Sequence, residues 1–164
     1  MTVRVAAHED AADIYRLLCG FATSYRPERA VFEDRTFPSV MEAAAAGSAE
    51  FLVAERDGAV AGYLLAARAP TLFAGGTVLE VLELAVDEAD RGRGIGSLLV
   101  RAAVDKAGQA GDVEVTVPTR RAARFYDRLG FTETAAYFKY NLGRAAADTG
   151  GGSGSEEGFD ERTT

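Results

Sequence analysis

Residues 84–99 read LAVDEADRGRGIGSLL, and they constrain the fold more than any other stretch of the chain. An apolar run ends at Val86, three glycines follow at positions 92, 94 and 96, and an apolar pattern with helical spacing begins directly afterwards. Glycine loses more backbone freedom on folding than any other residue, so three within five positions indicate a local backbone requirement. The stretch predicts a strand that passes through a close turn directly into a helix.

A turn of this kind favours phosphate binding. The N–H groups of a first helical turn have no partner within the helix, and the helix dipole adds partial positive charge there. Glycines leave room for an anion to approach these N–H groups. Two nucleotide-binding motifs do not fit: a dinucleotide fingerprint counted from Gly92 would need a glycine where Ser97 stands, and a P-loop needs a lysine that this stretch lacks.

The pattern of apolar residues divides the rest of the chain into short strands and helices. Asp57-Gly58 lies between two apolar runs within residues 49–69 and predicts a hairpin. Residues 23–40 are expected to form a loop with short helical turns. Further strands are predicted at residues 2–7, 77–87, 112–117 and 135–142, and helices at 9–22, 39–47, about 94–108 and 119–130.

With 164 residues, the chain is long enough for one domain with a substantial core. We expect this domain to span residues 1–142. Residues 143–164 are rich in glycine and serine and then acidic, and they have no periodic apolar face, so we expect a flexible tail there.

The net charge of −7 argues against nonspecific nucleic-acid binding, which depends on neutralising phosphates. Residues 91–128 nevertheless hold eight basic and four acidic side chains, a local balance of +4. The sequence therefore predicts a local anion site within an acidic protein.

One cysteine, Cys19, excludes an internal disulfide, and its apolar neighbours in the predicted helix favour a packing role. With one histidine, His8, the chain offers no zinc-binding pattern, and we expect no metal. No apolar run reaches the length of a membrane span, and the first residues lack the pattern of a signal peptide. We therefore expect a cytoplasmic protein.

Two motifs resemble the GNAT superfamily of acetyl-CoA-dependent N-acetyltransferases. Residues 84–99 contain Arg91-Gly92-Arg93-Gly94-Ile95-Gly96, which is similar to the family's motif A core, R/Q-x-x-G-x-G/A. Residues 123–131, ARFYDRLGF, resemble the end of motif B, FY-x-x-LGF. The motifs stand in the family's order about 30 residues apart, and the resemblance extends over about residues 2–142.

This resemblance implies an α/β (α+β) fold with a mixed, mostly antiparallel central sheet flanked by helices. The fourth and fifth strands would be splayed to hold coenzyme A, and acetyl-CoA would be the cosubstrate. Thr119 stands where the family commonly has asparagine, so a contact made by that asparagine is in doubt. The residues implied in coenzyme binding are Leu84, Ala85, Val86, Arg91, Gly92, Arg93, Gly94, Ile95, Gly96, Ser97, Thr119 and Arg124, with Arg120 and Arg121 as further candidates for the 3′-phosphate.

The resemblance also implies direct attack of an amine on the thioester. Tyr126 is our candidate for protonating the departing sulfur, and a backbone N–H near Val86 would stabilise the oxyanion. Glu80 and Glu83 are the candidate bases, because carboxylates within an apolar strand are costly without a role. On a regular strand they face opposite sides, whereas a bulge between them would change that. We prefer Glu80, since Glu83 has a structural role as its alternative.

The expected reaction moves an acetyl group from acetyl-CoA to a primary amine of a small molecule or protein. Aromatic and acidic groups together suit a cationic amine. Two alternatives are a non-catalytic acyl-CoA-binding regulatory module and a nucleotide-binding protein that uses the same turn. We expect a small-molecule or peptide amine as partner, no nucleic acid and no membrane, and leave a homodimer open. The residues expected to line the acceptor cleft are Phe21, Tyr25, Arg26, Phe73 and Tyr137.

Overall fold

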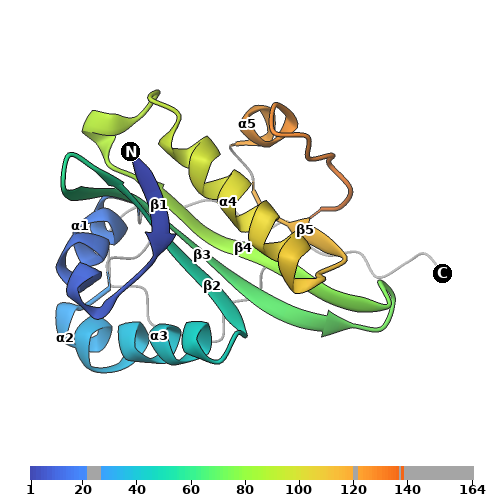
Figure 1. The fold of residues 1–164 in the computed structure, drawn as a ribbon, viewed down its shortest axis with the longest axis horizontal. Helices are drawn as coiled ribbons and strands as arrows, with labels where there is room; N and C mark the ends of the chain where they lie inside the picture. Colours follow the sequence, from blue (N-terminus) through green and yellow to red (C-terminus); the bar gives the residue numbers. More distant parts are fainter. Residues whose placement is uncertain (22–26, 120–121, 137, 139–164) are drawn as a thin grey trace, which may run out of the picture.

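A mixed five-stranded sheet forms the centre of the computed structural model, which describes residues 1–21, 27–119, 122–136 and 138 (Figure 1). Neighbouring strands follow each other in chain order, and the first four pair antiparallel, whereas the fifth lies parallel to the fourth. The mostly antiparallel mixed sheet expected from the sequence is confirmed. Its strands are β1 (Thr2–Val5), β2 (Ala49–Arg56), β3 (Ala59–Thr71), β4 (Gly76–Val86) and β5 (Glu114–Thr116).

The turn between β2 and β3 has the predicted hairpin geometry. Asp57 has a φ of 53° and Gly58 a φ of 81°, so both central residues are left-handed. Two positive φ values are what a type I′ turn requires, and its twist matches that of the flanking strands. The Asp57-Gly58 hairpin is therefore confirmed.

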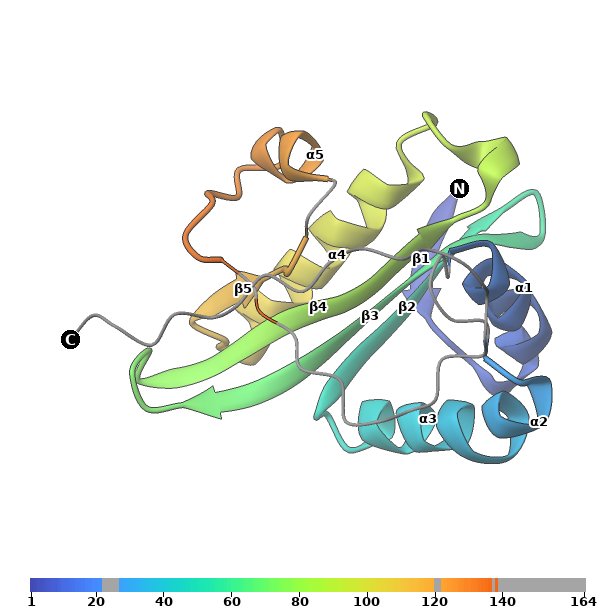
Figure 2. The same ribbon diagram turned by 180° about the vertical axis from the view of Figure 1, so that it is seen from behind.

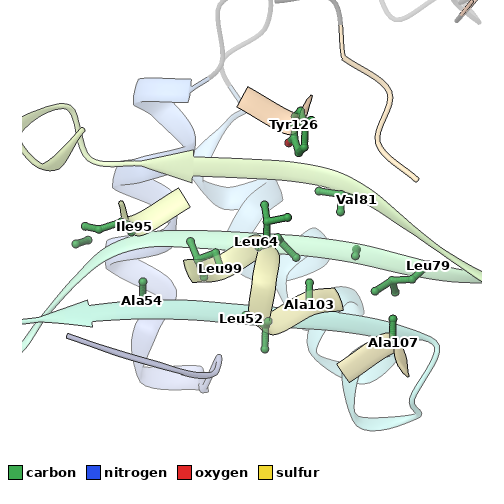
Figure 3. Packing of buried hydrophobic residues seen from close by; sticks show 13 residues of the cluster. Leu52, Ala54, Leu64, Leu79, Val81, Ile95, Leu99, Ala103, Ala107 and Tyr126 are labelled. Atoms are coloured by element: carbon green, nitrogen blue, oxygen red, sulfur yellow. The ribbon is translucent and has the colours of Figure 1, made fainter. Parts of the chain in front are cut away.

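Helices cover the two faces of the sheet separately (Figures 1 and 2). One face carries α4 (Ile95–Ala110), whose side chains at positions 95, 99, 103 and 107 pack in a row against β2, β3 and β4 (Figure 3). The other face carries α1 (Ala11–Phe21) and α3 (Phe37–Ala45). Successive residues of β3 serve the two faces in turn, with Tyr63 toward α1 and Leu64 toward α4. No described helix has the length and apolarity to cross a membrane.

Residues 29–45 are more helical than the sequence predicts. A short α2 (Arg29–Val31), a π-helical turn η2 (Phe32–Thr36) and α3 follow one another without a break. Pro38 lies in the first turn of α3, where its missing N–H costs no helical hydrogen bond. The short helical turns expected within residues 23–40 are therefore present from Arg29 onwards, but they run directly into α3, which begins at Phe37 and not at residue 39.

The end of the domain is less regular than predicted. The helix expected at residues 119–130 is reduced to α5 (Ala123–Asp127). Of the strand predicted at 135–142, residues 135, 136 and 138 form no strand, and the other five lie outside the described residues. The predicted tail at 143–164 also lies outside them.

Gly62 of β3 allows β4 and α4 to approach closely. A Cβ at this position would stand 2.8 Å from the carbonyl oxygen of Ala85 and 3.2 Å from Cγ2 of Ile95. The first of these atoms belongs to the backbone of β4, so rotation of a side chain would not relieve the contact. A glycine at 62 therefore fixes the distance between the strand and the start of the helix.

We expect Gly62→Ala to lower the free energy of unfolding by about 1–3 kcal/mol, because the added methyl overpacks against backbone. Denaturation in urea measures this loss. Gly20→Ala is the matched control, since a Cβ at Gly20 in α1 meets no atom within 4 Å. That variant should keep or slightly raise stability, and an equal loss in both variants would contradict the packing argument.

Candidate functional site

The ladder between β3 and β4 contains one extra residue on β4. Leu65 pairs with Glu83, whereas the next residue, Ala66, pairs with Val81. Leu82 is therefore inserted between two paired positions as a β-bulge. A bulge of this kind changes the face to which the following side chains point.

The bulge brings the two carboxylates of the strand onto one face. The hydroxyl of Tyr63, which packs on the side of α1 and α3, donates a hydrogen bond of 2.7 Å to Oε2 of Glu83. Glu80 pairs with Ala67, which lies two residues beyond Leu65 and so points to the same side. Both carboxylates therefore face α1 and α3. On a regular strand they would face opposite sides, so the bulge explains this arrangement.

The surroundings of these two carboxylates differ. Tyr63 is 1% exposed, and burial, followed by the charge of Glu83, raises the pKa of its hydroxyl far above the ordinary value. The hydroxyl therefore stays protonated and holds Glu83 as a donor. Glu80 pairs with Ala67 in the ladder, and no hydrogen bond or ion pair joins its carboxylate to another side chain in the part of the chain that the structure describes.

Pairing between β5 and β4 ends after three residues, where β5 itself ends. The parallel pairing joins Val78–Glu80 to Glu114–Thr116, and no described strand pairs with that edge of β4 beyond Glu80. Residues 81–86 therefore offer backbone N–H and C=O groups along an open edge, where an extended ligand can add hydrogen bonds as a strand would. Among the described residues β4 thus continues beyond the end of β5, whereas a splay of the two strands stays a prediction.

The glycine turn joins this edge to α4. Gly92 has a φ of 77° and Gly94, the N-cap residue of α4, a φ of 84°. The first helical hydrogen bond runs from the N–H of Leu98 to the carbonyl of Gly94 at 3.0 Å, so the N–H groups of residues 95–97 precede the helical ladder. A Cβ at Gly92 or Gly94 would meet no atom within 4 Å, which leaves open space beside the turn.

A pocket of about 580 Å³ lies between the open edge, the turn and α5. Its wall contains predicted coenzyme-binding residues from both expected segments, 84–86 and 91–97. Within these segments, Arg93 does not line the pocket. Sequence analysis missed three wall residues, Asp90, Phe125 and Arg128. Arg128 lies one helical turn after Arg124, so helical spacing from a predicted residue is a signal for it, whereas Phe125 adjoins Tyr126 on another side of the helix and no spacing rule indicates it.

Ion pairs from distant segments hold the loop between β4 and α4. Asp87 accepts the N–H of Ala89 at 3.0 Å and caps the short helix η3 (Glu88–Asp90), and it also pairs with Arg16 of α1. The hydrogen bond from Ala89, followed by the contact with Arg16, lowers the pKa of Asp87. Asp90 pairs with Arg56 at the end of β2. The loop is thus tied to both a helix and a strand.

Tyr126 lies on the face of the sheet that carries α4. It is 7% exposed, and its ring packs edge-on against Phe125 and Phe131, with centroids 4.9 and 5.4 Å apart. Figure 3 shows it above β4, beside Val81. Burial raises the pKa of Tyr126 above its ordinary value, so the phenol remains a proton donor at neutral pH. It does not line the pocket, although its neighbour Phe125 does.

Several predicted site residues are not gathered here. Phe73 is 85% exposed at the tip of the β3–β4 hairpin, and the strand from Gly76 to Glu83, about 23 Å long, lies between this tip and Glu83. Thr119 accepts the N–H of Ala122 at 3.2 Å ahead of α5, which is a local turn contact. Neither Thr119 nor Arg124 lines the pocket. The side chain of Phe21 and residues Tyr25, Arg26, Arg120, Arg121 and Tyr137 lie outside what the structure describes.

The arrangement has a distinct chemistry on each side of the sheet. On the α4 side, free N–H groups, Arg91 and Arg128 can hold an anion, and the open strand edge can pair with an amide-containing arm. On the α1 side, Glu80 and Glu83 favour a cation. Among the described residues no group of three or more histidine, cysteine, aspartate or glutamate side chains could hold a metal ion.

The sequence matches the model of a known protein family. The model of the acetyltransferase (GNAT) family matches residues 11–131, a range that includes the bulged strand, the glycine turn and α5. No curated protein matches the sequence.

Solved structures of similar fold cover most of the chain. A transcriptional regulator from Bacillus halodurans C-125 has a TM-score of 0.77 at 26% identity, over 86% of this chain and 99% of its own. A glucosamine-6-phosphate N-acetyltransferase from Arabidopsis thaliana has a TM-score of 0.75 at 18% identity, over 87% and 98%. A ribosomal-protein-alanine N-acetyltransferase from Brucella melitensis biovar Abortus 2308 has a TM-score of 0.66 at 21% identity, over 87% and 99%.

Proposed function

The chain belongs to the acetyltransferase (GNAT) family, which implies acyl transfer, and from this premise we propose an acetyl-CoA-dependent N-acetyltransferase. Its acceptor is a primary amine of a small molecule or a protein, which attacks the thioester directly. The observation that supports this most is the pocket between the open edge of β4 and the start of α4.

The pocket fits the two parts of coenzyme A that lead to the thioester. The pyrophosphate would lie on the N–H groups of residues 91–97 with the hydroxyl of Ser97, where the glycines leave open space. The pantetheine amides would pair with backbone of Leu84–Val86 along the edge that β5 leaves open. Arg91 and Arg128 in the wall supply positive charge, which suits phosphates.

The proposed chemistry uses groups from both faces of the sheet. The amine nitrogen forms a bond to the thioester carbonyl carbon, and its proton passes to Glu80, directly or through water. A backbone N–H near Val86 stabilises the oxyanion. When the carbon–sulfur bond breaks, the thiolate takes a proton from Tyr126. Glu83, held by Tyr63, adds negative charge beside the base and supports a cationic acceptor.

The acceptor would approach from the face with the two carboxylates, opposite the pocket. The names of the similar proteins point to different acceptor amines. One is named for glucosamine-6-phosphate and another for ribosomal-protein alanine. The decisive experiment measures release of free thiol from acetyl-CoA across polyamines, aminoglycosides, amino acids, amino sugars and peptide N-termini.

Thiol release with at least one amine supports the enzyme. Binding of acetyl-CoA without thiol release from any amine would favour a non-catalytic acyl-CoA-binding module. Thermal stabilisation by NAD or ATP but not by coenzyme A would instead indicate a nucleotide-binding protein.

We expect Gly94→Val to abolish acetyl-CoA binding, because the side chain projects into the open space beside the turn and strains a φ of 84°. Calorimetric titration measures the affinity. Gly111→Val is the matched control: Gly111 ends the same helix with a φ of 80° and no atom within 4 Å of a Cβ. The control should lose similar stability and keep its affinity; unchanged affinity in folded Gly94→Val would mean that phosphate binds elsewhere.

We expect Tyr126→Phe to lower kcat by about 10²-fold or more, as loss of a general acid does, while the affinity for acetyl-CoA changes little. The phenyl ring preserves the packing against Phe125 and Phe131. Steady-state kinetics and titration on one preparation measure both quantities. Full turnover would remove Tyr126 from the mechanism.

The two carboxylates serve as controls for each other. We expect Glu80→Gln to lower kcat by about 10²-fold, because the base is lost, whereas Glu83→Gln lowers it less and mainly raises KM for the amine. The reverse order of effects would make Glu83 the base.

A further inference from the structure

An acidic side chain stands in the wall of the pocket that we assign to a diphosphate. Among the described residues, the charged side chains that line this pocket are those of Arg91, Arg128 and Asp90. A carboxylate near a phosphate repels it, and the repulsion is larger in a partly desolvated pocket than in water. Asp90 therefore opposes the ligand unless another group neutralises it.

Two arginines share one oxygen of this carboxylate. Arg56, the last residue of β2, contacts Oδ1 of Asp90 through Nη1. Arg93 of the glycine turn lies farther away, with its Nε 3.6 Å from the same Oδ1. Arg93 is exposed and does not line the pocket, whereas Asp90 is mostly buried. The close partner therefore comes from the sheet, and the loose partner from the turn.

Arg56 has one other acidic contact, and it is weaker. Its Nε lies 3.2 Å from Oδ2 of Asp57, a residue that is almost fully exposed in the hairpin turn. Ion pairs with exposed partners contribute little, because water screens them. The pairing with Asp90 is the one that occurs beside the pocket wall.

We propose that Arg56 is a positioning residue for the coenzyme: it neutralises Asp90 from the β2 side and so leaves Arg93 available to the diphosphate. This proposal rests on the proposed function. Without Arg56, the negative charge of Asp90 would repel the phosphate. Asp90 would also keep Arg93 as its ion-pair partner. With Arg56 in place, Arg93 can leave Asp90 for the phosphate without exposing an unpaired carboxylate.

A double-mutant cycle tests this proposal by calorimetric titration with acetyl-CoA. We expect Arg56→Gln to weaken binding about tenfold, in the range of couplings between residues in contact. Adding Asp90→Asn to Arg56→Gln should restore the affinity to within about twofold of that of the unaltered protein, and Asp90→Asn alone completes the cycle. Arg29→Gln is the matched control, since it removes the same charge from the ion pair between Arg29 of α2 and Glu33 of η2.

Specificity for the diphosphate separates this role from a purely structural one. Arg56→Gln should weaken acetyl-CoA binding but leave the affinity for acetyl-pantetheine, which lacks the diphosphate, unchanged, whereas a distorted pocket would bind both ligands more weakly. Equal affinity of Arg56→Gln and the unaltered protein would overturn the proposal, as would a double variant that binds as weakly as Arg56→Gln. If the unaltered protein does not bind acetyl-CoA at all, the proposed function itself fails.

Discussion

The end of the pairing between β5 and β4 after Glu80 is the constraint on which the rest of the site depends. A strand inside a sheet has its backbone groups paired on both edges, and it has none left for a ligand. Here one edge is released over residues 81–86 while β3 still holds the other, so the strand stays fixed and yet exposes polar backbone. The glycine turn continues from this edge, which aligns an amide-pairing surface with an anion-binding helix start.

The bulge at Leu82 belongs to the same arrangement. It turns both carboxylates of β4 toward α1 and α3, while the pocket lies on the side of α4. The two carboxylates and the pocket thus lie on opposite faces of the sheet, whereas Tyr126 lies on the same face as the pocket. Tyr63 adds rigidity, because a buried phenol holds Glu83 from the neighbouring strand.

Sequence predicted the parts of this fold that local chemistry determines. Asp57-Gly58 predicted its hairpin and the glycines predicted the turn, because positive φ values restrict the choice of residue. Proline at position 38 misled the prediction, since its effect depends on whether it begins a helix or interrupts one. The contact of Arg56 with Asp90, across 34 residues, depends on how β2 meets the loop, and no local pattern encodes that. Phe73 is an aromatic residue of the kind expected in an acceptor cleft. Its position at the hairpin tip depends on the lengths of β3 and β4.

The two faces of the sheet draw on separate parts of the chain. Helices α1, α2 and α3 all precede residue 46, whereas the residues of the pocket wall fall between 84 and 128. In the proposed enzyme, substitutions in the N-terminal quarter would therefore alter which amines are accepted without changing the residues of the pocket wall. Arg16 limits this independence, because it joins α1 to Asp87 in the loop that precedes the turn. A lineage that diversifies its acceptors has reason to keep that one arginine.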